Sequence, residues 1–153
     1  MITIVLVDDH QLVRQGVKSL LNLEPDFKVI GEASNGIDGI ALVERLHPDI
    51  LLSDLMMGDF GGIDVTRAVC KSCPKTKTII LSMYGDPVYI KHALKEGARG
   101  WVLKGNSIDE LVAAIRTVDA GECYISQEIT DQHGGLIVGA IAGVSAIVPR
   151  LLP

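Results

Sequence analysis

The sequence of 153 residues predicts a doubly wound α/β domain, in which helices cover both faces of a parallel sheet. Three observations predict this fold class. Short runs of β-branched and aliphatic residues recur along the chain, amphipathic stretches separate them, and the runs are apolar at consecutive rather than alternate positions. Consecutive apolar residues indicate a strand that is buried on both faces, as parallel strands between two helical layers are.

Five segments have the composition expected of these strands, and each ends at or beside a polar or charged residue. They are ITIVLV from Ile2, FKVIGE from Phe27, ILLSD from Ile50, TIILS from Thr78 and GWVLK from Gly100. Their alternation with helical stretches over residues 1 to 125 predicts five βα units joined by right-handed crossovers.

The segments between the strands have apolar residues at helical spacing. In the first two segments these are Leu12, Val13, Val17, Leu20 and Leu21, then Ile37, Ile40, Ala41, Val43 and Leu46. The third segment, IDVTRAVCKSC, is amphipathic and stops before a proline. For the fourth, Asp86 followed by proline predicts an N-cap and a helix that stops at Gly97. Ser107 and Glu110 have capping-box spacing for a fifth helix that ends near Gly121.

The composition is that of an ordinary globular protein, with 48% hydrophobic and 22% charged residues. The formal net charge of -5 and the pI near 5.3 argue against a surface that neutralises nucleic-acid phosphates. We therefore expect no nucleic-acid binding by this chain alone. The N-terminus, MITIVLVDDHQ, becomes acidic too early for a secretory signal, which predicts a cytoplasmic protein.

The three cysteines are expected to be reduced thiols, because their number is odd and their spacing suggests no disulfide framework. Cys70 and Cys73 form a C-x-x-C pattern that could serve redox chemistry or half a zinc site. The pair lies at the end of an amphipathic helical stretch, where small buried residues are common, and a zinc site would need two further ligands. We therefore favour a packing role.

Polar residues end four of the predicted strands. Asp8 and Asp9 follow the first, Asp54 ends the third, Ser82 ends the fourth and Lys104 ends the fifth. Ligands of doubly wound sheets collect at the carboxyl ends of the strands, so we expect all five residues to face one crevice. Taken singly, each has a structural alternative: a helix cap for the acids, a turn for the serine and a solvated strand end for the lysine.

Three carboxylates at one sheet edge repel one another unless a cation lies among them or one is protonated. Oxygen ligands without clustered His or Cys favour Mg²⁺ over zinc. His10 is expected in the first turn of the following helix and not on the metal, and the other three histidines are given no role. A carboxylate can also attack phosphorus and form an aspartyl phosphate, with Lys104 and the Ser82 hydroxyl compensating the phosphoryl oxygens.

The segments VLVDDH, LLSDLMM, IILSMYGD and GWVLK resemble the blocks of response-regulator receiver domains of two-component systems. The longer segments around them are similar to sequences of the NarL/FixJ (LuxR-type) family. These segments are DDHQLVRQGV, GEASNG and SMYGDPVYIKHALKEGARGWVLK. The resemblance runs from Thr3 to about Ile125. It implies a flavodoxin-like (βα)5 fold with a five-stranded parallel sheet in the order 2-1-3-4-5 and helices on both faces.

The resemblance also implies the roles of individual residues. Asp54 would be the phosphoacceptor, and Asp8 and Asp9, with Asp54 and the Met56 backbone carbonyl, would hold Mg²⁺. Lys104 would assist at the phosphoryl group.

A second set of residues is implied in switching and in the lifetime of the phosphoryl group. Ser82 and Lys104 would be switch residues. Trp101 stands three residues before the lysine, where receivers keep a switch aromatic, although such a ring on a terminal strand often only packs in the core. Met56 and Tyr84, each two residues after a site residue, would flank the attacking water and tune dephosphorylation.

The function implied is a phosphorylation-activated switch that receives its phosphoryl group from a histidine kinase and catalyses only its own phosphorylation and dephosphorylation. The preferred hypothesis is the receiver part of a NarL/FixJ-type transcriptional regulator, and a stand-alone receiver acting through protein contacts is the alternative. A Mg²⁺ phosphohydrolase of the haloacid-dehalogenase type is disfavoured, because that family has two acids spaced by one residue after strand 1, whereas Asp8 and Asp9 are adjacent.

The sequence departs from the family pattern after Asp54, where Gly58, Gly61 and Gly62 replace a proline-containing turn. Three glycines predict a looser loop and a less fixed Met56 carbonyl. A glycine also follows Lys104, so no cis peptide is expected there.

The larger departure is the C-terminal segment. We divide the chain into a receiver domain, 1–125, and a linker or apolar tail, 126–153, which has no room for a helix-turn-helix domain. Its apolar part is shorter than the ~20 residues of a membrane-spanning helix. Its origin stays open: a shortened regulator, an artefact of cloning or reading frame, or a segment that packs on a partner. Its apolar character predicts a homodimer, through the tail or through the face of helix 4, strand 5 and helix 5.

Overall fold

The computed structural model describes residues 1–142, with side chains to residue 135, and its centre is a parallel sheet in the order β2-β1-β3-β4-β5-β6. All strand pairs run parallel. The strands are β1 (Ile2–Val7), β2 (Phe27–Ala33), β3 (Ile50–Asp54), β4 (Lys77–Ser82), β5 (Gly100–Leu103) and β6 (Tyr124–Ile125).

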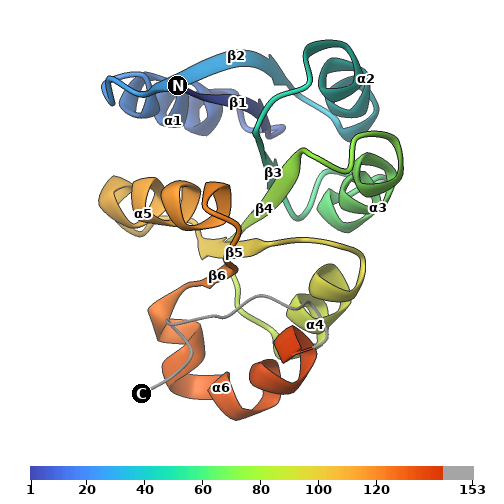
Figure 1. Cartoon of the computed structure of the whole chain (residues 1–153), viewed down its shortest axis with the longest axis vertical. Helices are drawn as coiled ribbons and strands as arrows, with labels where there is room; N and C mark the ends of the chain where they lie inside the picture. The colour runs from blue at the N-terminus through green and yellow to red at the C-terminus, as the bar shows by residue number, and fades with distance from the viewer. Residues whose placement is uncertain (143–153) are drawn as a thin grey trace.

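Helices cover both faces of this sheet (Figure 1). They are α1 (Gln11–Leu21), α2 (Gly36–Leu46), α3 (Gly62–Ser72), α4 (Pro87–Lys95), α5 (Ile108–Asp119) and α6 (Gln127–Ala142). Helices α1 and α5 lie on one face, α2, α3 and α4 on the other, and α6 lies beyond β6 and beside α4 (Figure 1). Helix α6 is kinked at His133. The predicted doubly wound α/β fold and the order of its first five strands are confirmed.

The prediction of five strands is wrong by one, because a short sixth strand pairs with β5. Tyr124 lies beside Gly100 and Ile125 beside Trp101 in parallel register. A strand of two residues has no periodicity that a sequence pattern could reveal. The consequence is that β5 is an inner strand, and the chain continues from β6 directly into α6.

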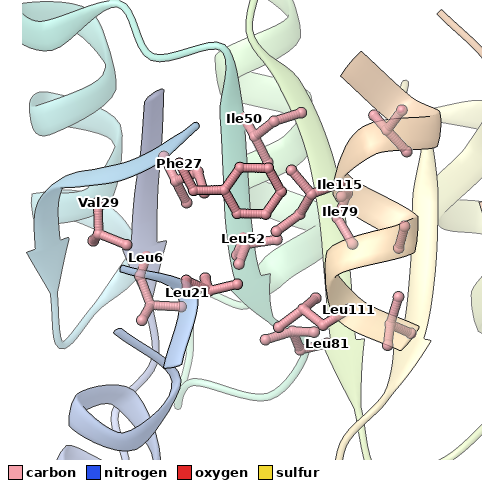
Figure 2. Packing of buried hydrophobic residues seen from close by; sticks show 14 of the residues in the cluster. Leu6, Leu21, Phe27, Val29, Ile50, Leu52, Ile79, Leu81, Leu111 and Ile115 are labelled. Atoms are coloured by element: carbon pink, nitrogen blue, oxygen red, sulfur yellow. The ribbon is translucent and has the colours of Figure 1, made fainter. Parts of the chain in front are cut away.

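The consecutive apolar residues of the strands pack against both helical layers, because successive side chains point to opposite faces of the sheet. Along β1, Ile4 and Leu6 join the cluster under α1 and α5, whereas Val5 and Val7 join the cluster under α2 and α3. All four are fully buried. In Figure 2, side chains of α5, including Ile115, point toward the strands in the first of these clusters. Burial of one such aliphatic side chain contributes about 1.5–3 kcal/mol, so the strands form a rigid support for the sheet edge.

The helix ends agree with the sequence in part. The Asp86 carboxylate caps α4 as predicted by accepting a hydrogen bond from the amide of Val88 at 2.9 Å. Ser107 Oγ accepts the Glu110 amide at 3.3 Å, which is one half of the predicted capping box. The carboxylate of Glu110 does not return to Ser107 but accepts hydrogen bonds from other residues, including Ser126. In place of the second half of the box, Glu110 makes a long-range contact with Ser126.

The cysteines are free thiols, as predicted. Cys70 is exposed, while Cys73 and Cys123 are buried. Cys73 Sγ lies 3.9 Å from Nδ1 of His47. No helix within residues 1–142 combines the length and the apolar character needed to cross a membrane.

The loop between β3 and α3 uses two of its glycines for close approach. A Cβ atom on Gly61 would lie 2.6 Å from the Leu55 carbonyl oxygen, and one on Gly62 would lie 2.5 Å from the Asp54 carbonyl oxygen. The Gly62 amide donates to the Leu55 carbonyl at 2.9 Å. The prediction of a loose loop therefore missed the role of these two glycines, which seat the start of α3 against the end of β3.

Substitution of Gly62 by alanine should destabilise the protein by about 1–3 kcal/mol, because the added methyl group would meet backbone that cannot move aside freely. Gly16→Ala is the matched control. Gly16 lies within α1 with nothing within 4 Å of its added Cβ, and alanine there should stabilise by roughly 0.5–1 kcal/mol. Urea unfolding of the two variants measures both changes, and equal stabilities would contradict the close approach.

Candidate functional site

The carboxyl ends of β1, β3 and β5 bring together four of the residues that the sequence singles out. Asp8 and Asp9 follow β1, Asp54 ends β3, and Lys104 follows β5. Asp8 and Asp54 are buried, while Asp9 is 42% exposed. One oxygen of each acid lies within 4.8 Å of the others. The parallel register makes this meeting unavoidable, since all three strands end at the same edge of the sheet.

Lys104 bridges two of the acids. Its Nζ lies 2.9 Å from Asp8 Oδ2 and 3.2 Å from Asp54 Oδ1, and its side chain is only 11% exposed. Its amide donates to the Ser82 carbonyl at 2.7 Å, which fixes the lysine to the end of β4. Ion pairs at this level of burial are screened far less by solvent than surface pairs are.

One lysine does not satisfy this cluster of carboxylates. Asp8 Oδ2 is paired with Lys104, whereas Asp54 Oδ2 is buried and accepts no hydrogen bond from the described residues. Burial raises the pKa of the Asp54 carboxyl; Lys104 lowers it, and Asp8 and Asp9 raise it further. A buried carboxylate oxygen without a donor is costly. Oxygen ligands arranged in this way fit a hard divalent cation such as Mg²⁺.

His10 lies in the same cluster, which the sequence analysis did not foresee. It is the N-cap residue of α1, immediately before the first turn where it was expected. Its side chain makes no capping hydrogen bond, and Nδ1 lies 3.0 Å from Asp8 Oδ1, 3.2 Å from Asp9 Oδ1 and 3.7 Å from Asp54 Oδ2. Its position directly after the two acids is the signal that could have suggested this.

Arg14, on α1, was also missed. Its Nη1 donates to the Asp8 carbonyl at 2.6 Å, and its Nε donates to Glu32 at 3.0 Å. Lys18 donates to the same carboxylate at 2.8 Å. Lys18 and Arg14 therefore hold the pKa of Glu32 below its ordinary value. These contacts tie α1 to β2 and fix the backbone that carries Asp8; a basic residue one turn into α1 is their only trace in the sequence.

Ser82 and Trp101 are joined through the backbone of Tyr84. Ser82 Oγ accepts a hydrogen bond from the Tyr84 amide at 3.1 Å, and the Tyr84 carbonyl accepts Trp101 Nε1 at 3.1 Å. Ser82 is 3% exposed and Trp101 is 1% exposed. The side chains of Tyr84 and Met56 are exposed on the loops that follow β4 and β3. The hydroxyl of Ser82 is thus held within its own loop.

Known proteins resemble this chain over most of its length. The family of the response regulator receiver domain matches residues 4–116. The transcriptional regulatory protein DegU of Brevibacillus brevis is 40% identical over 129 residues, which cover 84% of this chain and 55% of DegU. The oxygen regulatory protein NreC of Staphylococcus carnosus is 39% identical over 129 residues, 83% of this chain and 59% of NreC. The chain spans little more than half the length of these relatives.

Solved structures give the same picture. A LuxR-family two-component response regulator from an Aurantimonas species superposes with a TM-score of 0.82 at 31% identity, covering 92% of this chain and 97% of that one. The signal receiver domain of the putative regulator NarL from Mycobacterium tuberculosis gives 0.76 at 32% identity, covering 79% and 98%.

Replacing Asp54 by asparagine should stabilise the protein in the presence of a chelator. The change removes one buried charge from a cluster in which like charges repel, and an effect of about 1 kcal/mol is expected. Urea unfolding at pH 7 measures it. Asp109→Asn, at an exposed position of α5, should change stability by less than about 0.5 kcal/mol. A less stable Asp54→Asn variant would refute the view that the carboxylates strain the fold.

Proposed function

This chain belongs to the family of response regulator receiver domains, and from that premise we propose that Asp54 accepts a phosphoryl group from a histidine kinase. The observation that carries the proposal is the setting of Asp54. Its carboxylate is buried at a sheet edge, with one oxygen 3.2 Å from Lys104 Nζ and the other without a hydrogen-bond donor among the described residues. A carboxylate held in this way is available to attack phosphorus.

In this reaction a bond forms between an Asp54 oxygen and phosphorus as the bond from phosphorus to the donor imidazole nitrogen breaks. The imidazole leaves with the bonding electron pair. Lys104 already lies against Asp54, so its ammonium can compensate charge on the transferred group with little movement. Ser82 can donate its hydroxyl proton to a phosphoryl oxygen, because its bond to the Tyr84 amide uses the oxygen only as an acceptor.

The acids fit Mg²⁺, which receiver domains of this family bind in an acidic pocket. Asp8, Asp9, Asp54 and the Met56 carbonyl are the proposed ligands. The ion would neutralise the acids and the incoming phosphoryl oxygens. The buried Asp54 oxygen without a hydrogen-bond donor supports this assignment, because a divalent cation would remove the cost of burying it.

The switch that we propose starts at Ser82. When its hydroxyl turns to the phosphoryl group, the bond to the Tyr84 amide is lost and the loop after β4 moves. The same loop holds the Trp101 indole through the Tyr84 carbonyl, so the ring can respond. The exposed side chains of Met56 and Tyr84 are proposed to flank the attacking water and set the rate of dephosphorylation.

The output is proposed to be regulation of transcription in a two-component system, as the names of DegU and of the LuxR-family structures suggest for those proteins. A stand-alone receiver in the cytoplasm that acts through protein contacts is the alternative. A homodimer through α4, β5 and α5 or through the tail remains a proposal, as does the division into residues 1–125 and 126–153. Part of that tail lies outside the described residues.

Incubation with acetyl phosphate and Mg²⁺ should add one phosphoryl group to the native chain and none to Asp54→Asn, because Asp8, the other buried carboxylate beside Lys104, is assigned to the metal and not to the phosphoryl group. Intact mass spectrometry measures the adduct. Asp109→Asn should be phosphorylated as the native chain is. An adduct on both the native chain and Asp54→Asn, or on neither, would refute the assignment.

The fluorescence of Trp101, the only tryptophan, should change when beryllofluoride and Mg²⁺ bind to the native chain. The indole would lose or weaken its hydrogen bond to the Tyr84 carbonyl as the loop after β4 moves. Asp54→Asn provides the control without an acceptor carboxylate. If an adduct forms and the emission spectrum stays the same, Trp101 has no part in the switch.

A further inference from the structure

The first turn after β6 lies against both loops that carry the switch residues. We term residues 126–129 the brace. We propose that the brace holds the loops of Ser82 and Lys104 in their resting arrangement, so that phosphorylation of Asp54 releases the first turn of α6. This inference rests on the proposed function, because it concerns the response to a phosphoryl group on Asp54.

Ser126 forms the first half of the brace, on the β5 side. Its amide donates to the Trp101 carbonyl at 3.0 Å, and its Oγ accepts the Leu103 amide at 3.0 Å. The same hydroxyl donates to Glu110 of α5. Ser126 is fully buried, so if its contacts break, each of these groups loses a hydrogen-bond partner that water does not replace. The residue next to Lys104 in the chain is thereby held by Ser126.

A second set of hydrogen bonds closes the loop between β5 and α5. Asn106 Nδ2 donates to Glu110 at 3.0 Å and to Glu128 of the brace at 2.7 Å. Asn106 lies two residues after Lys104. The loop that carries Lys104 is therefore attached to the brace on both sides of the lysine.

Ile129 forms the other half of the brace, against the loop between β4 and α4. It is 3% exposed, and a Cβ atom added to Gly85 would lie 2.5 Å from its Cγ1. Only a glycine fits there. Gly85 follows Tyr84, whose amide binds the Ser82 hydroxyl. A movement of Ser82 toward the phosphoryl group displaces this loop, and Ile129 lies directly against it.

Ile129 joins the second half of the brace to a buried cluster between α4, β5 and β6. Ile129 packs with Ile90 and Leu94 of α4, Trp101 of β5 and Ile125 of β6. Figure 1 shows α6 following β6 at the edge of the sheet, and α6 is in contact with α4. The side chains of a close-packed cluster have few alternative arrangements. A shift of the loop between β4 and α4 is therefore transmitted to the first turn of α6 and not absorbed within the cluster.

Linkage makes this proposal testable in both directions. If the brace stabilises the resting arrangement, then weakening it must strengthen binding of a phosphoryl mimic, and the mimic must loosen the brace. A brace that served stability alone would lower the unfolding midpoint when mutated and leave the affinity for the mimic unchanged.

The first experiment compares Ser126→Ala and Ile129→Ala with Gln127→Ala in the full chain. Gln127 lies in the same turn, and its side chain bonds to Asp131 of α6 rather than to either loop. Titration calorimetry with beryllofluoride at saturating Mg²⁺ should give about fivefold tighter binding for the two brace variants, and binding within about twofold of native for Gln127→Ala. Unchanged or weaker binding by both brace variants overturns the proposal.

The second experiment needs no variant and so does not depend on the folding of one. Hydrogen exchange, followed by mass spectrometry, should be faster at the amides of Ile129 and Thr130 after beryllofluoride and Mg²⁺ are added, since both donate to the Ser126 carbonyl in the resting arrangement. Unchanged or slower exchange with a beryllofluoride adduct present overturns the brace while the proposed function stands. The absence of any adduct would refute the proposed function itself.

Discussion

The crowding of carboxylates around Asp54 is the constraint on which the rest of the structure depends. Parallel strands deliver their polar ends to one sheet edge, and here the first and third strands deliver acids. Lys104, which follows the fifth strand, offsets part of the repulsion among the carboxylates. Asp54 nevertheless keeps an oxygen without a donor in the described structure, and burial raises the pKa of the Asp54 carboxyl. An arrangement that is poor for stability suits the binding of a divalent cation, which would offset the repulsion among the carboxylates.

The rigidity of the sheet is what allows this crowding to persist. Strands β1, β3 and β4 are buried along nearly their whole length, and their side chains fill clusters on both faces, of which Figure 2 shows the one under α1 and α5. Relaxation by moving a strand would cost the burial of several aliphatic side chains, each worth about 1.5–3 kcal/mol. The loops after β4 and β5 are attached mainly by individual hydrogen bonds, worth about 1 kcal/mol each. The loops are therefore the parts of the site that can move at the lowest cost.

Apolar runs and the positions where such runs stop predicted the first five strands and helices and the strand ends that carry the site, whereas the order of the strands was implied by the resemblance to receiver domains. It did not predict β6, since two residues have no pattern, nor the contact of Glu110 with Ser126, since local spacing favoured a capping box. His10 was assigned to a helix turn although its ring lies among the acids. Features that depend on contacts between distant segments leave little trace in the sequence.

Trp101 joins the site to α6 physically. Its indole nitrogen donates to the Tyr84 carbonyl, its own carbonyl accepts the Ser126 amide, and its side chain belongs to the same buried cluster as Ile129. Because β5 is hydrogen bonded to β4 and to β6, a shift of the Trp101 backbone would break the sheet, so in the proposed switch the ring moves instead. Rotation of the ring would give up the Tyr84 bond and free space in the cluster that holds Ile129. In that switch a loop movement at Ser82 and a loosening of α6 are one event, and a change at a single carboxylate would reach α6.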